Sequence, residues 1–242
     1  MLILALDSTA LCASVALCRD EQLLAEYTVN TGHTHSETLL PMVESVLKTC
    51  GVGIGEIDLF ACTAGPGSFT GVRIGAATIK GLAFGKDKPC IGVSTLDALA
   101  DNTAFLDGIL CPTMNARRSQ VYTALFSAEN SAVTRLCPDR AISIAELAEE
   151  VARLDPQRPV YLTGDGAELT YDVFRAVDGL SGRTHLLPHR LQNQSGYHTA
   201  QVARRLYDSG ARTTDAALVP TYLRPSQAER MREEQQKNNS TT

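Results

Sequence analysis

The sequence predicts an α/β fold in which one unit, three strands followed by alternating helices and strands (βββαβαβα), occurs twice. Three observations support this prediction: apolar runs of strand length, stretches with a helical apolar period, and short polar turns between the first strands. Apolar residues make up 44% of the 242 residues and aromatic residues only 5%, so we expect a core of Leu, Ala, Val and Ile. A chain of this length can bury a sizeable core in one large domain or two small ones.

The first half of the chain alternates between strand-like and helix-like segments. Short polar turns separate its first three apolar segments, which predicts antiparallel hairpins. In the next segment Ser36 is a candidate N-cap, Gly51 is a stop signal, and Pro41 is expected to shift the helix start or kink the helix. The elements expected here are strands over 2–7, 12–18 and 22–29, a helix over 36–50, a strand over 57–63, a helix over 69–84, a strand over 89–93 and a helix over 94–101.

The second half repeats this order in pattern, although not in letters. The elements expected here are strands over 108–114, 120–127 and 132–136, a helix over 144–153, a strand over 160–163, a helix over 168–177, a strand over 185–187 and a helix over 197–209. We therefore predict two subdomains, 1–103 and 104–225. Residues 226–242 are almost all polar and lack an apolar stripe, which predicts a solvated, disordered tail.

Charge and cysteine usage narrow the function classes. The 22 basic and 27 acidic residues give a formal charge of −5, which argues against a protein that grips nucleic acid without a partner or a local basic patch. The seven cysteines are odd in number and form no C-x-x-C pair, so we expect reduced thiols. With no signal-peptide pattern at the N-terminus and no apolar run long enough to span a bilayer, a cytoplasmic location without membrane contact is expected.

A glycine-rich stretch from Gly65 to Gly75, between a predicted strand and a predicted helix, is the strongest local feature. Its backbone N–H groups could hold an anion at the helix start. Alternatively, Gly71 and Gly75, with Thr78 on the same side, could let another backbone pack closely. The stretch lacks the Gly-Lys-Ser/Thr of a Walker A loop, the glycine spacing of a dinucleotide fingerprint and the glycine of a hydrolase elbow.

Three other polar segments were weighed as sites. Asp7-Ser8-Thr9, after the first strand, suits either a phosphate-binding hairpin or an ordinary capped turn. Asn115-Ala116-Arg117-Arg118 occupies the corresponding place in the second half and suits either an anion contact or a solvated turn. His33 and His35 lie two residues apart, but no further ligand stands near them, so no metal site is predicted. No nucleophile, base and orienting group occur together, so no catalytic residue is predicted.

Several of these segments resemble the TsaB family, also called YeaZ. The resemblance spans about 1–225 and is densest in 1–100. The matching segments are Leu2–Thr9 with Cys12–Leu17, His35–Met42, Gly65–Gly75, Gly92–Leu96, Asn115–Arg117 with Val121-Tyr122, and Val219–Arg224.

The resemblance implies an actin/Hsp70/sugar-kinase-like fold with two RNase H-like subdomains. It also implies a non-catalytic scaffold subunit that dimerises with a TsaD-type catalytic subunit, which transfers threonylcarbamoyl to the adenosine next to the tRNA anticodon. A TsaE-type ATPase assists, a homodimer is a further expectation, and tRNA is met only through the complex. No cofactor would be bound firmly, whereas ATP or ADP, with Mg²⁺, would bind at the partner interface.

In the family the first two helices pack against the same helices of the partner. The interface residues that this implies here are Leu39, Leu40, Val43, Val46, Leu47, Gly71, Val72, Gly75, Ala76, Thr78, Ile79 and Leu82. The residues for nucleotide or anion binding would be Asp7, Ser8, Thr9, Gly65, Gly67, Ser68, Thr70 and Arg73.

Two departures from the family bear on activity. The His-x-x-x-His metal pair of the catalytic paralogue has no counterpart in Ser94–Ala100, and Asn115 stands where many members carry aspartate. An amide is a weaker ligand for magnesium-bound water than a carboxylate. Both departures argue against independent activity, so the alternative, an ATP-binding kinase-like or acyltransferase enzyme of the same fold, is the second hypothesis. A homodimeric binding module is the third.

Overall fold

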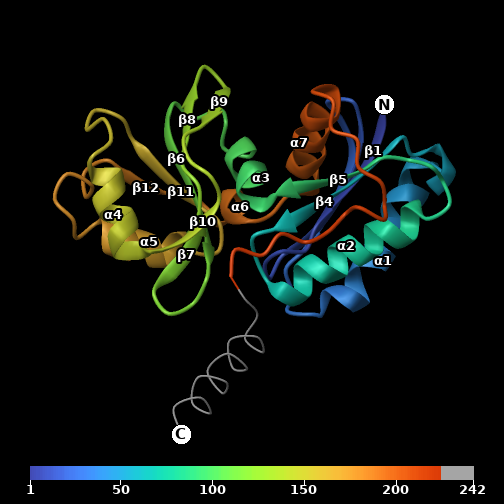
Figure 1. Ribbon diagram of the computed structural model, residues 1–242, viewed down its shortest axis with the longest axis horizontal. Coiled ribbons are helices and arrows are strands. Elements are labelled where there is room, and N and C mark those ends of the chain that lie inside the picture. Colours follow the sequence, from blue (N-terminus) through green and yellow to red (C-terminus); the bar gives the residue numbers. More distant parts are fainter. Residues whose placement is uncertain (225–242) are drawn as a thin grey trace, which may run out of the picture.

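The computed structural model describes residues 1–224 and contains two α/β lobes (Figure 1). The first lobe contains β1 (Leu2–Asp7), β2 (Ala13–Arg19), β3 (Gln22–Val29), α1 (His35–Cys50), the short 3-10 helix η1 (Ile54–Glu56), β4 (Leu59–Gly65), α2 (Phe69–Ala83), β5 (Cys90–Ser94) and α3 (Thr95–Asp101). The second part contains β6 (Gly108–Asn115), β7 (Gln120–Thr123), β8 (Phe126–Glu129), β9 (Ala132–Arg135), β10 (Arg140–Ser143), α4 (Ile144–Ala152), β11 (Val160–Thr163), α5 (Ala167–Phe174), β12 (Thr184–Leu186), α6 (His189–Gln192) and α7 (Gly196–Asp208). The tail predicted over 226–242 lies outside the described residues.

The two sheets have the same topology. The first has the order β3-β2-β1-β4-β5, and the path through the second is β10-β7-β6-β11-β12. In each, the first three strands pair antiparallel and the last three pair parallel. The duplicated unit predicted from the sequence, and the RNase H-like fold implied by the resemblance, are confirmed.

The third strand of the second sheet differs from the prediction. The strand expected over 120–127 is interrupted at Ala124-Leu125, so β7 pairs with the end of β6 and β8 pairs with its start. The segment expected as the third strand forms β9, which pairs only with β8 in a hairpin beyond the main sheet. β10, which was not predicted, pairs with β7 instead. A four-residue strand next to a helix cap carries too little apolar pattern to be recognised.

The last helices of the two halves pack differently: α3 packs between the lobes, whereas α7 packs on the first sheet. Helices α1 and α2 cover one face of the first sheet, where the core contains Leu4, Leu6 and Val46. The opposite face, with Ile3 and Ala5, packs against α7, although α7 follows the second lobe in sequence. The apolar stripe of α7, which belongs by sequence to the predicted subdomain 104–225, is buried on the first sheet (Figure 1).

Hydroxyl caps set the starts of several helices. The side chains of Ser68, Ser94, Ser143 and Ser195 each accept a backbone N–H of the first turn that follows, which satisfies a donor that the helix leaves unpaired. In α1 the N-cap is Thr34 rather than the predicted Ser36, and the helix continues through Pro41. Gly51 ends α1 in the left-handed conformation, and the helix stop predicted there is confirmed. No helix among residues 1–224 is long and apolar enough to cross a membrane.

Candidate functional site

The glycine-rich turn between β4 and α2 packs on the turn that follows β1. The backbone N–H of Ser68 donates to the Thr9 oxygen at 2.7 Å. A Cβ on Gly67 would lie 2.5 Å from that same oxygen, closer than non-bonded atoms approach. Of the two interpretations left open by the sequence, the geometry shows close packing at this turn.

The same close approach continues along α2. The Ser8 hydroxyl donates to the carbonyl oxygen of Gly71 at 2.9 Å, and the Ser8 carbonyl occupies the space that a Cβ on Gly71 would need. One turn later, a Cβ on Gly75 would lie 2.6 Å from the Ser8 hydroxyl oxygen. The two glycines therefore let α2 lie directly against the end of β1.

Asp7 is enclosed by this packing. Its Oδ1 accepts the backbone N–H of Thr9 at 2.8 Å and the Thr9 hydroxyl at 2.7 Å. Its Oδ2 is buried and has no hydrogen-bond partner among residues 1–224. Burial raises the pKa of Asp7 to about 6, against the lowering effect of the Thr9 hydrogen bonds. Ser8 and Thr9 are also buried, so none of the three side chains is open to a ligand in this conformation.

A C-terminal segment, residues 220–224, covers the glycine-rich turn; we call it the strap. The Thr221 N–H donates to the Ala64 oxygen at 2.7 Å. The Tyr222 ring stacks on Phe69 with a centroid separation of 4.9 Å, and its hydroxyl accepts from Arg73 Nε at 2.7 Å. Only about 10 Å³ of space remains between the strap and the turn, about one water molecule and far less than a nucleotide needs.

Of the eight residues predicted to bind nucleotide or anion, six contact one another or the strap through packing or hydrogen bonds, namely Asp7, Thr9, Gly65, Gly67, Ser68 and Arg73. Gly65 approaches the Thr221 backbone, and Ser68 caps α2. Thr70 and Arg73 are exposed on the first turns of α2. The structure brings the predicted segments together but fills the space between them with the chain's own atoms.

Most of the predicted interface residues face the chain's own core. Eight of them are buried against the first sheet or the turn after β1, namely Leu39, Val43, Val46, Gly71, Val72, Gly75, Ala76 and Ile79. Leu47, Thr78 and Leu82 are half-buried, and Leu40 is 48% exposed. The apolar stripe therefore marks the inner face of each helix, so the buried side chains cannot contact a partner directly.

The outward face of α2 carries a different set of residues. Ala77 and Gly81 are exposed, and a Cβ on Gly81 would meet no atom within 4 Å. Phe84, directly after the helix, is 77% exposed. Helix α1, which packs beside α2, presents Leu40 to solvent. We call these exposed residues of the two helices the outer α1–α2 face, and it is partly apolar. Its small residues were missed because their spacing carries no hydrophobic signal.

The turn between β6 and β7 projects from the second lobe. Asn115 Oδ1 accepts the backbone N–H of Arg117 at 2.8 Å, and the Asn115 N–H donates to Asp165 at 2.8 Å. Arg117, Arg118 and Ser119 all have positive φ angles, between 53° and 63°, and all three are exposed.

His33 and His35 do not form a pair. His33 is exposed, whereas His35 Nε2 lies 2.7 Å from the Ala10 oxygen. Within residues 1–224 no three His, Cys, Asp or Glu side chains are grouped as metal ligands.

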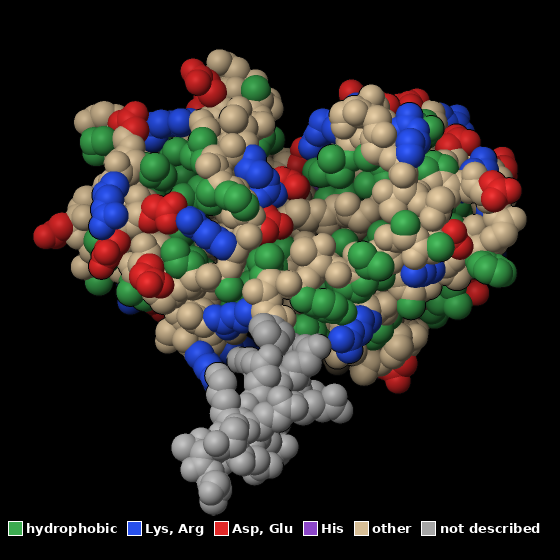
Figure 2. Space-filling model, viewed as in Figure 1, with side chains coloured by type: hydrophobic (Ala, Val, Ile, Leu, Met, Phe, Trp, Pro, Cys, Tyr) green, Lys and Arg blue, Asp and Glu red, His purple; other side chains and the backbone are tan. Residues whose placement is uncertain are grey.

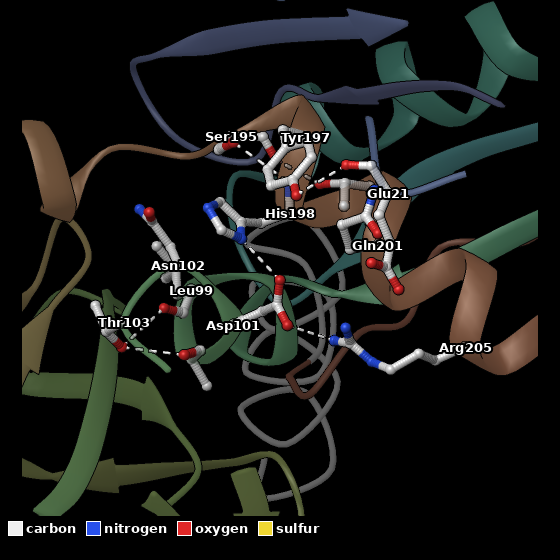
Figure 3. A network of polar contacts seen from close by, with 12 residues as sticks. Glu21, Leu99, Asp101, Asn102, Thr103, Ser195, Tyr197, His198, Gln201 and Arg205 are labelled. Atoms are coloured by element: carbon white, nitrogen blue, oxygen red, sulfur yellow. Dashed lines mark hydrogen bonds and ion pairs between the residues drawn. The ribbon is translucent and has the colours of Figure 1, made fainter. Parts of the chain in front are cut away.

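A groove of about 290 Å³ separates α7 from the β8–β9 hairpin; Figure 2 shows a hollow between the two lobes. At its floor Asp101, on α3, contacts two side chains of α7 (Figure 3). Its Oδ2 lies 2.7 Å from His198 Nδ1, and its Oδ1 accepts from Arg205. Across the groove, Arg135 pairs with Asp97 at 2.7 Å. These charges are paired with one another: Asp101 joins α3 to α7, and the Arg135–Asp97 pair joins the second lobe to α3.

Comparison with protein families gives one match over most of the chain. Residues 23–230 match the family model described as TsaD: tRNA N6-adenosine threonylcarbamoyltransferase. The TsaB protein of Bacillus subtilis, a tRNA threonylcarbamoyladenosine biosynthesis protein, is 35% identical over 182 residues, which are 75% of this chain and 79% of that protein. The Escherichia coli TsaB is also 35% identical, over 62% of this chain and 65% of its own length.

A solved structure agrees with this assignment. YeaZ from Pseudomonas aeruginosa superposes with a TM-score of 0.74 at 25% identity, and the match covers 92% of this chain and 99% of that one. The similarity therefore extends over both lobes and not only over the glycine-rich turn.

Proposed function

Because the chain belongs to the TsaB (YeaZ) family of tRNA threonylcarbamoyladenosine biosynthesis proteins, we propose that it is the scaffold subunit of a threonylcarbamoyl transferase complex. It dimerises with a TsaD-type catalytic subunit, which modifies the adenosine next to the tRNA anticodon. The match of this chain to the TsaD family model supports a pairing of two related folds through equivalent surfaces.

One observation carries the non-catalytic part of the proposal. The glycine-rich turn is the chain's most specific motif. Thr9 and the strap fill the space beside this turn. A substrate would have to displace both. The alternative, an independent kinase-like or acyltransferase enzyme, is not favoured.

The partner surface in this proposal is the outer α1–α2 face. Small side chains at Ala77 and Gly81 would let a partner helix approach closely, and Phe84 and Leu40 would supply apolar area. A second copy of the chain could use the same face, so a homodimer would compete with the heterodimer. ATP or ADP with Mg²⁺ would bind at the edge of this interface. A TsaE-type ATPase would assist the modification reaction.

The test is tRNA modification in vitro. The matched TsaD-type subunit, a TsaE-type ATPase, ATP, threonine, bicarbonate and the adenylate-forming enzyme are combined with unmodified tRNA, with and without this chain. We expect modification only when the chain is present, and no modification or ATP hydrolysis by the chain alone. Equal modification without the chain, or turnover by the chain alone, would contradict the proposal.

A further inference from the structure

Four arginines surround the strap and have no acidic partner within residues 1–224. Arg73 is on α2, Arg117 and Arg118 are on the β6–β7 turn, and Arg224 ends the strap. None of them forms an ion pair among residues 1–224, whereas six of the other eleven arginines in that range do. In a chain with an overall charge of −5, four such arginines around one segment form a local concentration of positive charge.

Contacts through the strap place the four arginines on one surface. Arg73 donates to Tyr222 at 2.7 Å. Two residues further along, Arg224 donates to the Ala116 oxygen at 3.2 Å, and Ala116 directly precedes Arg117 and Arg118. Figure 2 shows Lys and Arg side chains on both lobes near the point where the described chain ends. We call this surface the arginine rim.

The turn that carries Arg117 and Arg118 adopts a costly backbone conformation. Three consecutive non-glycine residues with positive φ are disfavoured by roughly 1 kcal/mol or more each. The Asn115 side chain stabilises the turn by accepting the Arg117 N–H. The nearest acid connected to the turn, Asp165, accepts a backbone N–H from Asn115 rather than a guanidinium, so both arginines stay available at the surface.

Aromatic rings accompany these charges. The Arg73 guanidinium lies 5.4 Å from the centre of the Tyr222 ring, which is itself 42% exposed. Arg224 lies 6.0 Å from the centre of the Tyr122 ring. Tyr122 is buried, whereas Tyr222 is exposed. Guanidinium groups beside an exposed ring suit nucleic acid, because phosphates pair with the guanidinium groups and an unstacked base can pack on the ring.

A mononucleotide does not suit this surface. The space behind the strap is about 10 Å³, and the arginines spread over both lobes instead of converging on a pocket. An extended polyanion can contact all of them at once, since its phosphates are spaced along a chain.

We propose that the arginine rim binds the phosphate backbone of the tRNA substrate, so that this subunit contacts RNA directly. This inference rests on the proposed function for the identity of the RNA, and it goes beyond a role in which tRNA is met only through the catalytic subunit.

The test measures the binding of a fluorescein-labelled, unmodified tRNA transcript by anisotropy over a series of salt concentrations. The full chain is used alone and in complex with the TsaD-type subunit. The variant Arg117→Gln/Arg118→Gln should bind roughly tenfold more weakly near physiological salt, and the slope of log K against log salt should fall by about 1.5, since each phosphate contact contributes about 0.7–0.9. Arg117→Lys/Arg118→Lys should keep the slope.

The matched control removes two arginines elsewhere on the second lobe. Arg153→Gln/Arg175→Gln loses the same charge from side chains that are 78% and 61% exposed and pair with acids on their own helices, so tRNA affinity should change less than twofold. The proposal would be overturned if the rim variant kept the wild-type slope of log K against log salt, both alone and in the complex. It would also be overturned if the control variant lost as much tRNA affinity as the rim variant. Displacement of tRNA by an equimolar amount of ATP would also overturn it, in favour of a mononucleotide site.

Heterodimer formation is followed in parallel by size-exclusion chromatography. If rim variants form the heterodimer but bind tRNA like the wild type, the proposed RNA-binding surface is overturned and the proposed function is not. Rim variants that lose the heterodimer while keeping tRNA affinity would make the rim a protein interface. Failure of the wild type to form a heterodimer would instead contradict the proposed function.

Discussion

Ser8 and Gly71 join β1 to α2 in two ways at once. The Ser8 hydroxyl donates to the Gly71 oxygen at 2.9 Å, and the Ser8 carbonyl fills the place of the side chain that Gly71 lacks. Because the same two residues share a hydrogen bond and a close contact, no space remains for a side chain larger than hydrogen at Gly71. The pair therefore explains why the glycine-rich segment is an internal packing element.

The first prediction concerns this contact. Gly71→Ala should destabilise the fold by about 1–3 kcal/mol, because the added methyl group forces α2 away from Ser8. Gly81→Ala is the matched control, since its Cβ would meet no atom, and it should leave stability unchanged or raise it by up to about 1 kcal/mol. Urea unfolding of both variants measures the difference, and equal stabilities would rule out the contact as the cause.

The second prediction concerns the outer α1–α2 face. Gly81→Trp should prevent close approach of a partner helix and weaken binding to the TsaD-type subunit at least tenfold, without lowering the melting temperature. Isothermal titration calorimetry measures the affinity. Leu169→Trp, at a side chain on α5 that is 48% exposed, should bind as the wild type does. Wild-type affinity in the Gly81→Trp variant would exclude this face as the interface.

The third prediction corrects an expectation from the sequence. Gly75→Leu would be designed to block the heterodimer and spare the monomer if Gly75 faced a partner. Because a Cβ at Gly75 meets Ser8 and Leu6, we expect this variant to lose stability first. A melting temperature equal to that of the wild type would restore the original expectation.

The fourth prediction concerns Asp7 and pH. Its pKa is raised from 3.8 to about 6 in the folded chain, so the folded state holds a proton here that the unfolded state releases. Ionising the buried carboxylate therefore lowers the free energy of unfolding. This loss is nearly absent below about pH 4 and is complete once the pH has risen through about 6. Relative to Asp7→Asn, which does not titrate, the wild type should lose about 2 kcal/mol between pH 4 and pH 7.5.

Urea unfolding of both proteins at several pH values measures this difference. A stability gap that stays constant from pH 4 to pH 7.5 would show that Asp7 titrates as an exposed carboxyl group does.

The fifth prediction concerns the strap. Tyr222→Phe keeps the stack on Phe69 but loses the acceptor for Arg73, so it should cost less than about 1 kcal/mol. Tyr222→Ala loses both and should cost about 1–2 kcal/mol. It should also speed proteolytic cleavage near the strap. Equal cleavage rates in the wild type and Tyr222→Ala would show that the ring does not hold the strap in place.

Much of the local structure is determined by the sequence itself. The apolar runs of β1 and β4, the helical period of α1 and the stop at Gly51 each depend on neighbours within a few residues, so pattern and propensity were enough to predict them. The repeated order of elements predicted the duplicated sheets in the same way. The family was recognised from short segments spread along the chain, each of which can be read without its neighbours in space.

The tertiary structure decided which face of each element is free. An apolar stripe shows that a helix buries one side, but it does not show whether the burial is against the chain's own sheet or a partner. For Val43 and Ile79 it is the chain's own sheet. The strap over the glycine-rich turn, the position of α7 on the first sheet and the arginine rim each join residues more than 40 positions apart. Long-range packing creates these contacts, and no local pattern records them.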